Sequence, residues 1–389
     1  MLPTALLGLL GIGGCHRDHF PTFPANYREF AYVSDGASGT VTVLNLVEMR
    51  QEQTLQVGKQ PTGLAVNPKR NEIYAVNTGS DSVSVIDAEA NRITATIPVH
   101  HGPYFISVAP DGKRAYVANS ASNSVSTLDL ETRREIGTTA AGEAPGVAQV
   151  SPDNRTVVVS NRGAGSVSVY SVTVNGPQPL HFRESFTGCP GATDVAILQD
   201  STKAFVTCSG SQQVMAIWLG AAPDSWRGKQ DATLQADHLL ALLDVGKTPT
   251  HLALKPDGGE VFSTNFGGNS LSEISTWTNE VSGTYSVVMQ PARAVVSRDN
   301  TSLWTSDFGS DSATLYSIDD GRVVASVHTG SHPDALAFSA DEHLLLVADS
   351  GSADVTVIRT NGPGGPTLFT LLPAGAQPND IVVKSFHVR

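Results

Sequence analysis

The chain has 389 residues, of which 40% are hydrophobic and 16% are charged, so it can bury a substantial core and is not a disordered polymer. It carries 25 basic and 37 acidic residues, a formal net charge of −12, and the basic residues are scattered along the chain. Nucleic acid binding needs a basic footprint that this composition does not supply, so we expect no nucleic acid partner.

The chain begins with an apolar run, residues 5–14, that ends at Cys15. About ten residues are too few to span a bilayer as a helix, and such a run is typical of a signal-peptide core. Residues 12–15 resemble the lipobox of bacterial lipoproteins, in which the cysteine is acylated, although no Lys or Arg precedes the run. We therefore expect residues 1–15 to be a lipoprotein-type signal with Cys15 lipidated. The alternative is an ordinary cleaved secretion signal with an incidental cysteine.

If Cys15 is lipidated, the mature protein is exported and held on a membrane, in the periplasm or at the cell surface. Residues 16–26 contain Pro21 and Pro24 and no hydrophobic periodicity, which indicates a short tether. The folded domain is then expected to begin near Tyr27 and to comprise residues 27–389.

A repeat covers this domain. A proline is followed sixteen residues later by Asn or Asp, and successive units lie mostly 42 residues apart. The pairs are Pro61 and Asn77, Pro103 and Asn119, Pro145 and Asn161, Pro249 and Asn265, Pro291 and Asp307, and Pro333 and Asp349. A seventh pair, Pro190 and Cys208, is longer by two residues and has Cys in place of Asn.

The two ends of the chain supply an eighth unit in two pieces. Asp35 ends a strand-like segment that has no matching proline before it, and Pro378 opens a segment that has no partner after it. Ring closure explains both, because the last strand then pairs with the first segment and leaves no sheet edge open.

Each unit reads as four short strands. In one copy these are residues 104–109, 115–119, 125–130 and 135–139, with a turn at Pro110 to Gly112. The sequence therefore predicts an all-β fold, a β-propeller of eight four-stranded blades closed by the C-terminal strand. The alternatives are seven blades, or a solenoid, which needs capping units in place of complementary ends.

The motifs at residues 74–77, 116–119 and 82–87 resemble the YVTN-type β-propeller repeat family. The resemblance covers residues 31–389 and rests on strand and turn positions, so it specifies the fold more than the function. It implies a bacterial surface or periplasmic propeller, related to lactonases and to the haem-binding propeller of nitrite reductases.

The loops that enter the innermost strands are expected to ring one mouth of the central channel. The densest charge in this ring comes from five residues, His251, Arg293, His332, Asp334 and Asp380. An arginine flanked by histidines suits a carboxylate or phosphate, so these residues predict a site for a small anionic ligand. The alternative is that each is solvated or paired with a neighbour, for instance Arg293 with Asp334.

Cys189 and Cys208 are expected at the same end of neighbouring antiparallel strands, which brings their Cα atoms within disulfide range. Export supplies the oxidising compartment, and a lipidated Cys15 leaves these two thiols to pair. The alternative is two buried thiols on opposite strand faces.

No catalytic constellation and no metal site is indicated. Covalent c-type haem is excluded because the chain has no Cys-x-x-Cys-His motif, and the cofactor, if any, is undetermined. A loop at residues 221–230, with Trp226, is a candidate binding insertion or a tolerated one. We therefore expect a binding or protein-interaction module; the alternatives are a lactonase-type hydrolase and a propeller that binds haem or another cofactor without covalent attachment.

Overall fold

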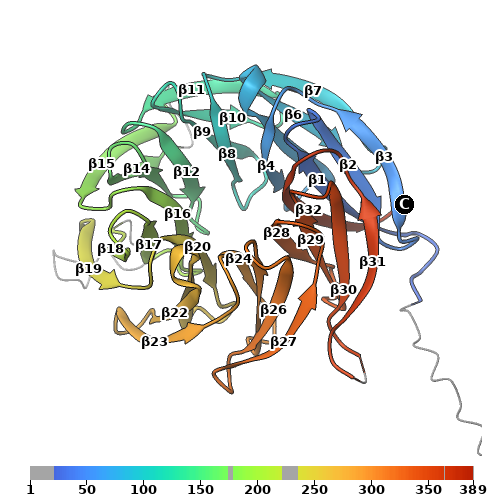
Figure 1. Ribbon diagram of the computed structural model, residues 1–389. Helices are drawn as coiled ribbons and strands as arrows, with labels where there is room; N and C mark the ends of the chain where they lie inside the picture. Colours follow the sequence, from blue (N-terminus) through green and yellow to red (C-terminus); the bar gives the residue numbers. More distant parts are fainter. Residues whose placement is uncertain (1–21, 174–177, 221–234, 363, 389) are drawn as a thin grey trace, which may run out of the picture.

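The protein is a ring of eight blades. The computed structural model describes residues 22–173, 178–220, 235–362 and 364–388, and these form eight four-stranded antiparallel sheets around one axis (Figure 1). The prediction of an eight-bladed all-β propeller is confirmed. Each blade is named below by its innermost strand. Within the described ranges, no helix is long and apolar enough to cross a membrane.

Four blades follow the chain from the innermost strand outward in the first half of the ring. The β4 blade contains β4 (Pro61–Val66), β5 (Glu72–Asn77), β6 (Ser82–Asp87) and β7 (Arg92–Pro98). The β8 blade contains β8 (Pro103–Val108), β9 (Arg114–Asn119), β10 (Ser124–Asp129) and β11 (Arg134–Ala140). The β12 blade contains β12 (Pro145–Val150), β13 (Thr156–Asn161), β14 (Ser166–Val172) and β15 (Leu180–Thr187). The β16 blade contains β16 (Ala192–Ile197), β17 (Lys203–Cys208), β18 (Gln213–Trp218) and β19 (His238–Asp244).

Three more blades repeat the same order, and two short 3-10 turns, η1 (Thr78–Ser80) and η4 (Phe266–Gly268), follow second strands. The β20 blade contains β20 (Pro249–Leu254), β21 (Glu260–Asn265), β22 (Ser270–Ser275) and β23 (Glu280–Ser286). The β24 blade contains β24 (Pro291–Val296), β25 (Ser302–Asp307), β26 (Ser312–Ser317) and β27 (Arg322–His328). The β28 blade contains β28 (Pro333–Phe338), β29 (Leu344–Asp349), β30 (Asp354–Arg359) and β31 (Thr367–Pro373).

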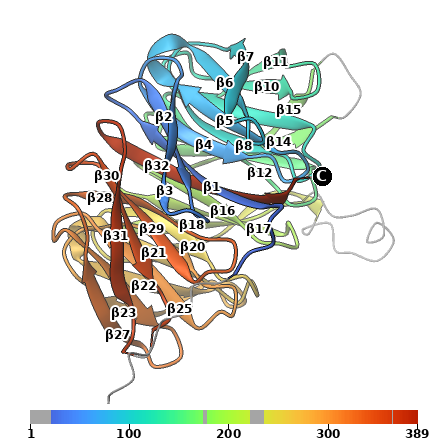
Figure 2. The ribbon, with the colours of Figure 1, turned by 90° about the vertical axis from the view of Figure 1, so that its right-hand side faces the viewer.

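The eighth blade joins the two ends of the chain. Its strands are β1 (Tyr27–Asp35), β2 (Thr40–Asn45), β3 (Arg50–Gln56) and, innermost, β32 (Pro378–His387). β32 runs antiparallel to β1, with Ala31 opposite Val383 and Ser34 opposite Asp380, as Figure 2 shows from the side. The predicted closure by the C-terminal strand is confirmed, and it leaves both edges of the ring paired.

Burial explains why the strands alternate in composition. The second and third strands lie between two neighbouring blades and are buried on both faces, as in β5 and β6, whereas the outermost strand β11 is exposed at every second residue. Apolar clusters fill the space between blades: Tyr74 and Val85 of one blade pack with Ile106 and Val117 of the next. Each blade is therefore stabilised by its neighbours.

The repeat asparagine, at the end of the second strand, forms side-chain hydrogen bonds with the third strand. Asn77 is fully buried, and its side-chain nitrogen donates to the hydroxyls of Ser82 and Ser84 at 3.2 and 3.0 Å. The serine-rich third strands of the repeat thus provide acceptors for a buried amide, which would otherwise carry a desolvation cost.

The sheet register corrects one detail of the repeat. In the β4 blade Pro61 pairs with Asn77, but in the β16 blade the residue paired with Cys208 is Ala192. Ala192 lies sixteen residues before Cys208, so the spacing between these two paired positions is the ordinary one, and Pro190 is not the repeat proline of this blade. The expected two-residue stretch was wrong because the proline had been taken as the marker of the register.

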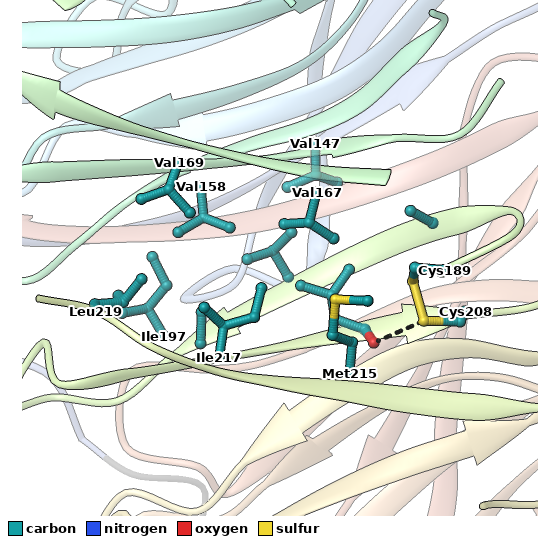
Figure 3. Packing of buried hydrophobic residues seen from close by; sticks show 14 residues of the cluster. Val147, Val158, Val167, Val169, Cys189, Ile197, Cys208, Met215, Ile217 and Leu219 are labelled. Carbon is teal, nitrogen blue, oxygen red and sulfur yellow. Dashed lines mark hydrogen bonds between the residues drawn. A yellow bond between two sulfur atoms is a disulfide. The ribbon is translucent and has the colours of Figure 1, made fainter. Parts of the chain in front are cut away.

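Cys189 and Cys208 form a disulfide in this blade, with their Cα atoms 4.7 Å apart. Figure 3 shows the bond at one end of the apolar cluster between the β12 and β16 blades, to which Val167 and Met215 also belong. Both cysteines are fully buried. The bond joins the loop before β16 to the end of β17, the pairing expected from the sequence.

Candidate functional site

One or two residues from every innermost strand surround the axis of the ring. The first residue after the repeat proline, or after Ala192, lines a cavity of about 420 Å³ in all eight blades. These residues are Thr62, Tyr104, Gly146, Thr193, Thr250, Ala292, Asp334 and Asn379. The second residue lines the same cavity in seven blades, as Gly63, Phe105, Val147, Asp194, His251, Arg293 and Asp380. A cavity of this size lies within the range that small-molecule sites occupy.

The cavity has one apolar and one charged wall. Gly63, Phe105 and Val147 come from three consecutive blades, β4, β8 and β12. The wall formed by the β16, β20 and β24 blades carries Asp194, His251 and Arg293, and the charge continues through Asp334 and Asp380. Because the blades are in chain order, the innermost strands place these two kinds of side chain on different sides of the ring, and Arg162, which follows β13, adds a charge on the apolar side.

Arg293 is paired with the closing strand. Its Nη1 lies 2.9 Å from Oδ1 of Asp380, and its Nη2 lies 3.4 Å from the carbonyl oxygen of Asn379. The other oxygen of Asp380 accepts the backbone N–H of Leu64 at 2.8 Å. Burial disfavours the charge on Arg293, but the carboxylates of Asp380, Asp334 and others outweigh it, so the pKa of Arg293 is raised.

His251 lies beside Asp194 and is held in one orientation. Its Nδ1 accepts the backbone N–H of Ala294 at 3.4 Å, and its Nε2 lies 3.7 Å from Oδ2 of Asp194. Asp194 itself accepts the backbone N–H groups of Leu252 and Val195, each at 2.9 Å. Burial lowers the pKa of His251 more than Asp194 raises it, so the imidazole is neutral at pH 7.

Two charged groups in the cavity have no such pairing. The guanidinium of Arg162, which follows β13, lies over the ring of Tyr104 at 4.8 Å from the centroid. Within the described ranges, no carboxylate lies within ion-pair distance of Arg162 and no donor bonds the carboxylate of Asp334. Burial raises the pKa of Asp334, and Arg293 opposes this shift.

The structure brings together four of the five residues expected at the channel mouth. His251, Arg293, Asp334 and Asp380 line one cavity, and Arg293 pairs with Asp380, while Asp334 only lies near it. His332 does not line this cavity: its ring stacks on Phe308, with centroids 4.6 Å apart.

The backbone explains the position of His332. The residue directly before each repeat proline is in the left-handed region, with φ of 50° at Gln60, 48° at Ala144 and 52° at His332. Its carbonyl accepts the N–H that follows the second strand, as Ser350 N–H donates to His332 at 3.0 Å. The pre-proline residue therefore forms part of a turn, and the residues that line the cavity begin two positions later, after the proline.

Sequence reasoning missed Asp194 and Arg162. Asp194 was hidden because Pro190 suggested the wrong register; counting sixteen residues back from Cys208 gives Ala192, and the second residue after it is Asp194. Arg162 directly follows the repeat Asn161, a position outside the expected loop set. Cys15 and the loop with Trp226 lie outside the described residues. In the part of the chain that the structure describes, no group of three or more His, Cys, Asp or Glu side chains is arranged to hold a metal ion.

Solved structures with the same architecture share little sequence with this chain. A dihydro-heme d1 dehydrogenase, NirN, in complex with DHE has 14% identity and a TM-score of 0.72, covering 93% of this chain and 76% of its own. AztD from Citrobacter koseri has 14% identity and a TM-score of 0.68, covering 93% and 99%. A putative 6-phosphogluconolactonase from Bacteroides fragilis has 13% identity and a TM-score of 0.61, covering 94% and 100%. At these identities the likeness shows the fold alone.

No curated protein sequence matches the chain significantly. A family model described as Lactonase, 7-bladed beta-propeller matches residues 27–149, 64–188 and 269–370, which together make up more than half of the chain. The match confirms the expected resemblance to lactonase-like propellers, although this ring has eight blades. The chain belongs to the lactonase β-propeller family.

Proposed function

We propose that the protein is a binding module that holds a small organic molecule in the central cavity. The observation that carries the proposal is the division of the cavity into an apolar wall, with Phe105 and Val147, and a charged wall, with His251 and Arg293. Such a site gives a ligand apolar contact on one side and fixes its orientation by polar contacts on the other.

The protonation of His251 favours binding over general-base catalysis. A general base needs a free lone pair directed at the substrate. In the neutral imidazole the Nδ1 lone pair accepts the Ala294 N–H, so the proton is on Nε2, which faces Asp194. His251 is therefore oriented as a hydrogen-bond donor.

Hydrolysis of a lactone is the second candidate, because the family model matches more than half of the chain. In this mechanism Arg293 or the Nε2–H of His251 polarises the ester carbonyl, water adds to the carbonyl carbon, and the ring C–O bond breaks while a proton of the water passes to the leaving alkoxide. A screen of lactones by pH-stat decides it: turnover that is lost in Arg293→Met supports hydrolysis, and a screen without turnover removes this candidate.

Haem binding is less well supported by the geometry. A haem iron bound by a single histidine needs a free imidazole nitrogen. His251 is the histidine of this cavity among the residues described, and its Nδ1 is already bonded while its Nε2 carries the proton toward Asp194. The residues present do not fit an axial haem ligand in this orientation.

We also propose that the protein is exported and held on a membrane through a lipidated Cys15. The apolar segment before Cys15 supports this location. The Cys189–Cys208 disulfide is in keeping with it, since such bonds persist in oxidising compartments outside the cytosol.

The binding proposal is tested by thermal shift with a library of small metabolites. We expect at least one compound to raise the Tm of the wild type and to lose its effect in Ala292→Trp, because Ala292 lines the cavity and its methyl side chain makes no hydrogen bond that the substitution would remove. Ala90→Trp, on an exposed outer hairpin, is the matched control and should keep the shift. If no compound shifts the Tm, or if the shift persists in Ala292→Trp, the cavity is not the binding site.

A further inference from the structure

Some of the charged side chains that line the cavity have a close partner, and others do not. Arg293 is satisfied by Asp380 at 2.9 Å, and Asp194 by two backbone N–H groups. His251 is neutral. This leaves one cation, Arg162, and one anion, Asp334, without an ion-pair partner among the described residues.

These two residues lie on opposite sides of the ring. Arg162 follows β13 in the β12 blade, and Asp334 lies on β28, four blades further round a ring of eight. Figure 1 shows β12 and β28 facing each other across the centre. Both side chains line the same cavity, and among the residues described neither lies within 4 Å of an oppositely charged side chain, so both charges are available to a ligand in the cavity.

The surroundings keep Arg162 open to the cavity. The ring of Tyr104 supports its guanidinium from one side, and an aromatic face stabilises a cation without consuming its hydrogen-bond donors in an ion pair. Gly146 lies beside it, where an added Cβ would be 3.8 Å from Nη2. The absence of a side chain at Gly146 therefore leaves room for a ligand group next to the guanidinium.

We propose that the cavity takes a zwitterionic small molecule of the amino-acid type, with its carboxylate on Arg162 and its ammonium group on Asp334. The inference rests on the proposed binding function and narrows it to one ligand class. A guanidinium binds a carboxylate through two parallel hydrogen bonds, and a carboxylate accepts the hydrogen bonds of an ammonium group. The apolar part of the ligand then lies toward Phe105 and Val147. A purely anionic ligand would add negative charge near Asp334, whose own charge is offset only by the more distant Arg293.

The test measures binding by calorimetry to a panel of aromatic and aliphatic amino acids, each with its decarboxylated amine and its deaminated acid. We expect at least one amino acid to bind at least tenfold more tightly than both of its analogues. Because this comparison uses the wild type alone, it does not depend on whether a variant folds.

Two variants then assign the contacts. Arg162→Met should reduce the affinity for the amino acid at least tenfold and leave the amine almost unaffected, whereas Asp334→Asn should weaken the amino acid and the amine but not the acid. Arg162→Lys keeps the charge and should recover part of the affinity.

Three results would overturn the inference. The first is that a deaminated acid binds the wild type as tightly as its amino acid does, and binds Asp334→Asn more tightly than it binds the wild type. The ligand is then an anion, and the binding proposal is unaffected. The second is that no amino acid in the panel binds, although a compound from the metabolite library does bind and Ala292→Trp abolishes its binding. The ligand then belongs to another chemical class. Failure of both the panel and the library rejects the binding proposal itself.

Discussion

The backbone N–H of Gly58 donates to Oδ1 of Asn77 at 3.1 Å, joining the loop before an innermost strand to the end of the strand beside it. A Cβ at Gly58 would lie 2.6 Å from the Cβ of Asn77, so only glycine fits there. Gly142 makes the same contact with the asparagine of its own blade at 3.0 Å. Glycine and the buried amide are thus one structural unit in the β4 and β12 blades.

In the β16 blade a disulfide occupies this place. Cys189 lies three residues before Ala192, as Gly58 lies three residues before Pro61, and Cys208 stands at the asparagine position. A covalent bond between Cys189 and Cys208 therefore takes the place of the hydrogen bond found in the β4 and β12 blades.

Removal of this bond should weaken the protein without changing its fold. We expect Cys189→Ala with Cys208→Ala to lower the free energy of unfolding by about 3 kcal/mol, because a loop of this length is no longer closed in the unfolded chain. Urea unfolding measures the loss. Titration of the unfolded, non-reduced mature protein should find neither thiol free, and both after reduction; two thiols free before reduction would contradict the bond.

Ring closure by β32 should be essential. Deleting residues 377–389 removes the strand that pairs with β1, exposes the apolar faces of two blades and removes the Arg293–Asp380 pair. We expect loss of cooperative unfolding and aggregation, measured by circular dichroism and light scattering. Deletion of residues 1–21 is the control and should leave the melting curve unchanged. A truncated ring that still melts cooperatively at the wild-type temperature would show that closure contributes little.

Buried aspartates replace the repeat asparagine in three blades, and the pKa of two of these aspartates is strongly raised. Burial raises the pKa of Asp307 and of Asp349 to about 7, and one oxygen of each carboxylate has no hydrogen-bond partner among the described residues. The unfolded chain releases these protons near pH 4, whereas the folded chain keeps them until about pH 7. The free energy of unfolding therefore falls as the pH rises through this window.

Asparagine at these positions should remove the pH dependence. We expect Asp307→Asn to raise the free energy of unfolding at pH 8 by about 2 kcal/mol and to give no gain at pH 4, because the amide reaches Ser312 and Thr314 as Asn77 reaches its serines. Urea unfolding across pH 4 to 8 measures the difference. Asn77→Asp is the reciprocal variant and should introduce the same decline; equal profiles for wild type and Asp307→Asn would contradict the assignment.

If Cys15 carries the lipid anchor, replacing it should change the cell fraction in which the protein is found. Cys15→Ser should move the protein from the detergent-soluble membrane fraction to the soluble periplasmic one, because the acyl anchor is no longer attached. Fractionation followed by mass spectrometry of the mature N-terminus measures this. A wild-type protein that is already soluble, with a mature N-terminus elsewhere, would exclude lipidation.

The repeat by itself determined the architecture. The spacing of Pro61 and Asn77, repeated along the chain, and the split unit at Asp35 and Pro378 specify eight closed blades, because turn residues and alternating apolar residues act over short distances. The pairing of Cys189 with Cys208 followed from the same strand geometry.

Only the tertiary structure decided which side chains meet at the axis. The left-handed residue before each proline directs His332 away from the cavity, and the register of β16 adds Asp194 to it. The pairing of Arg293 with Asp380, rather than with Asp334, depends on how the β24 blade faces the closing strand. These contacts join residues from different blades, and no local periodicity specifies how the blades are oriented around the ring.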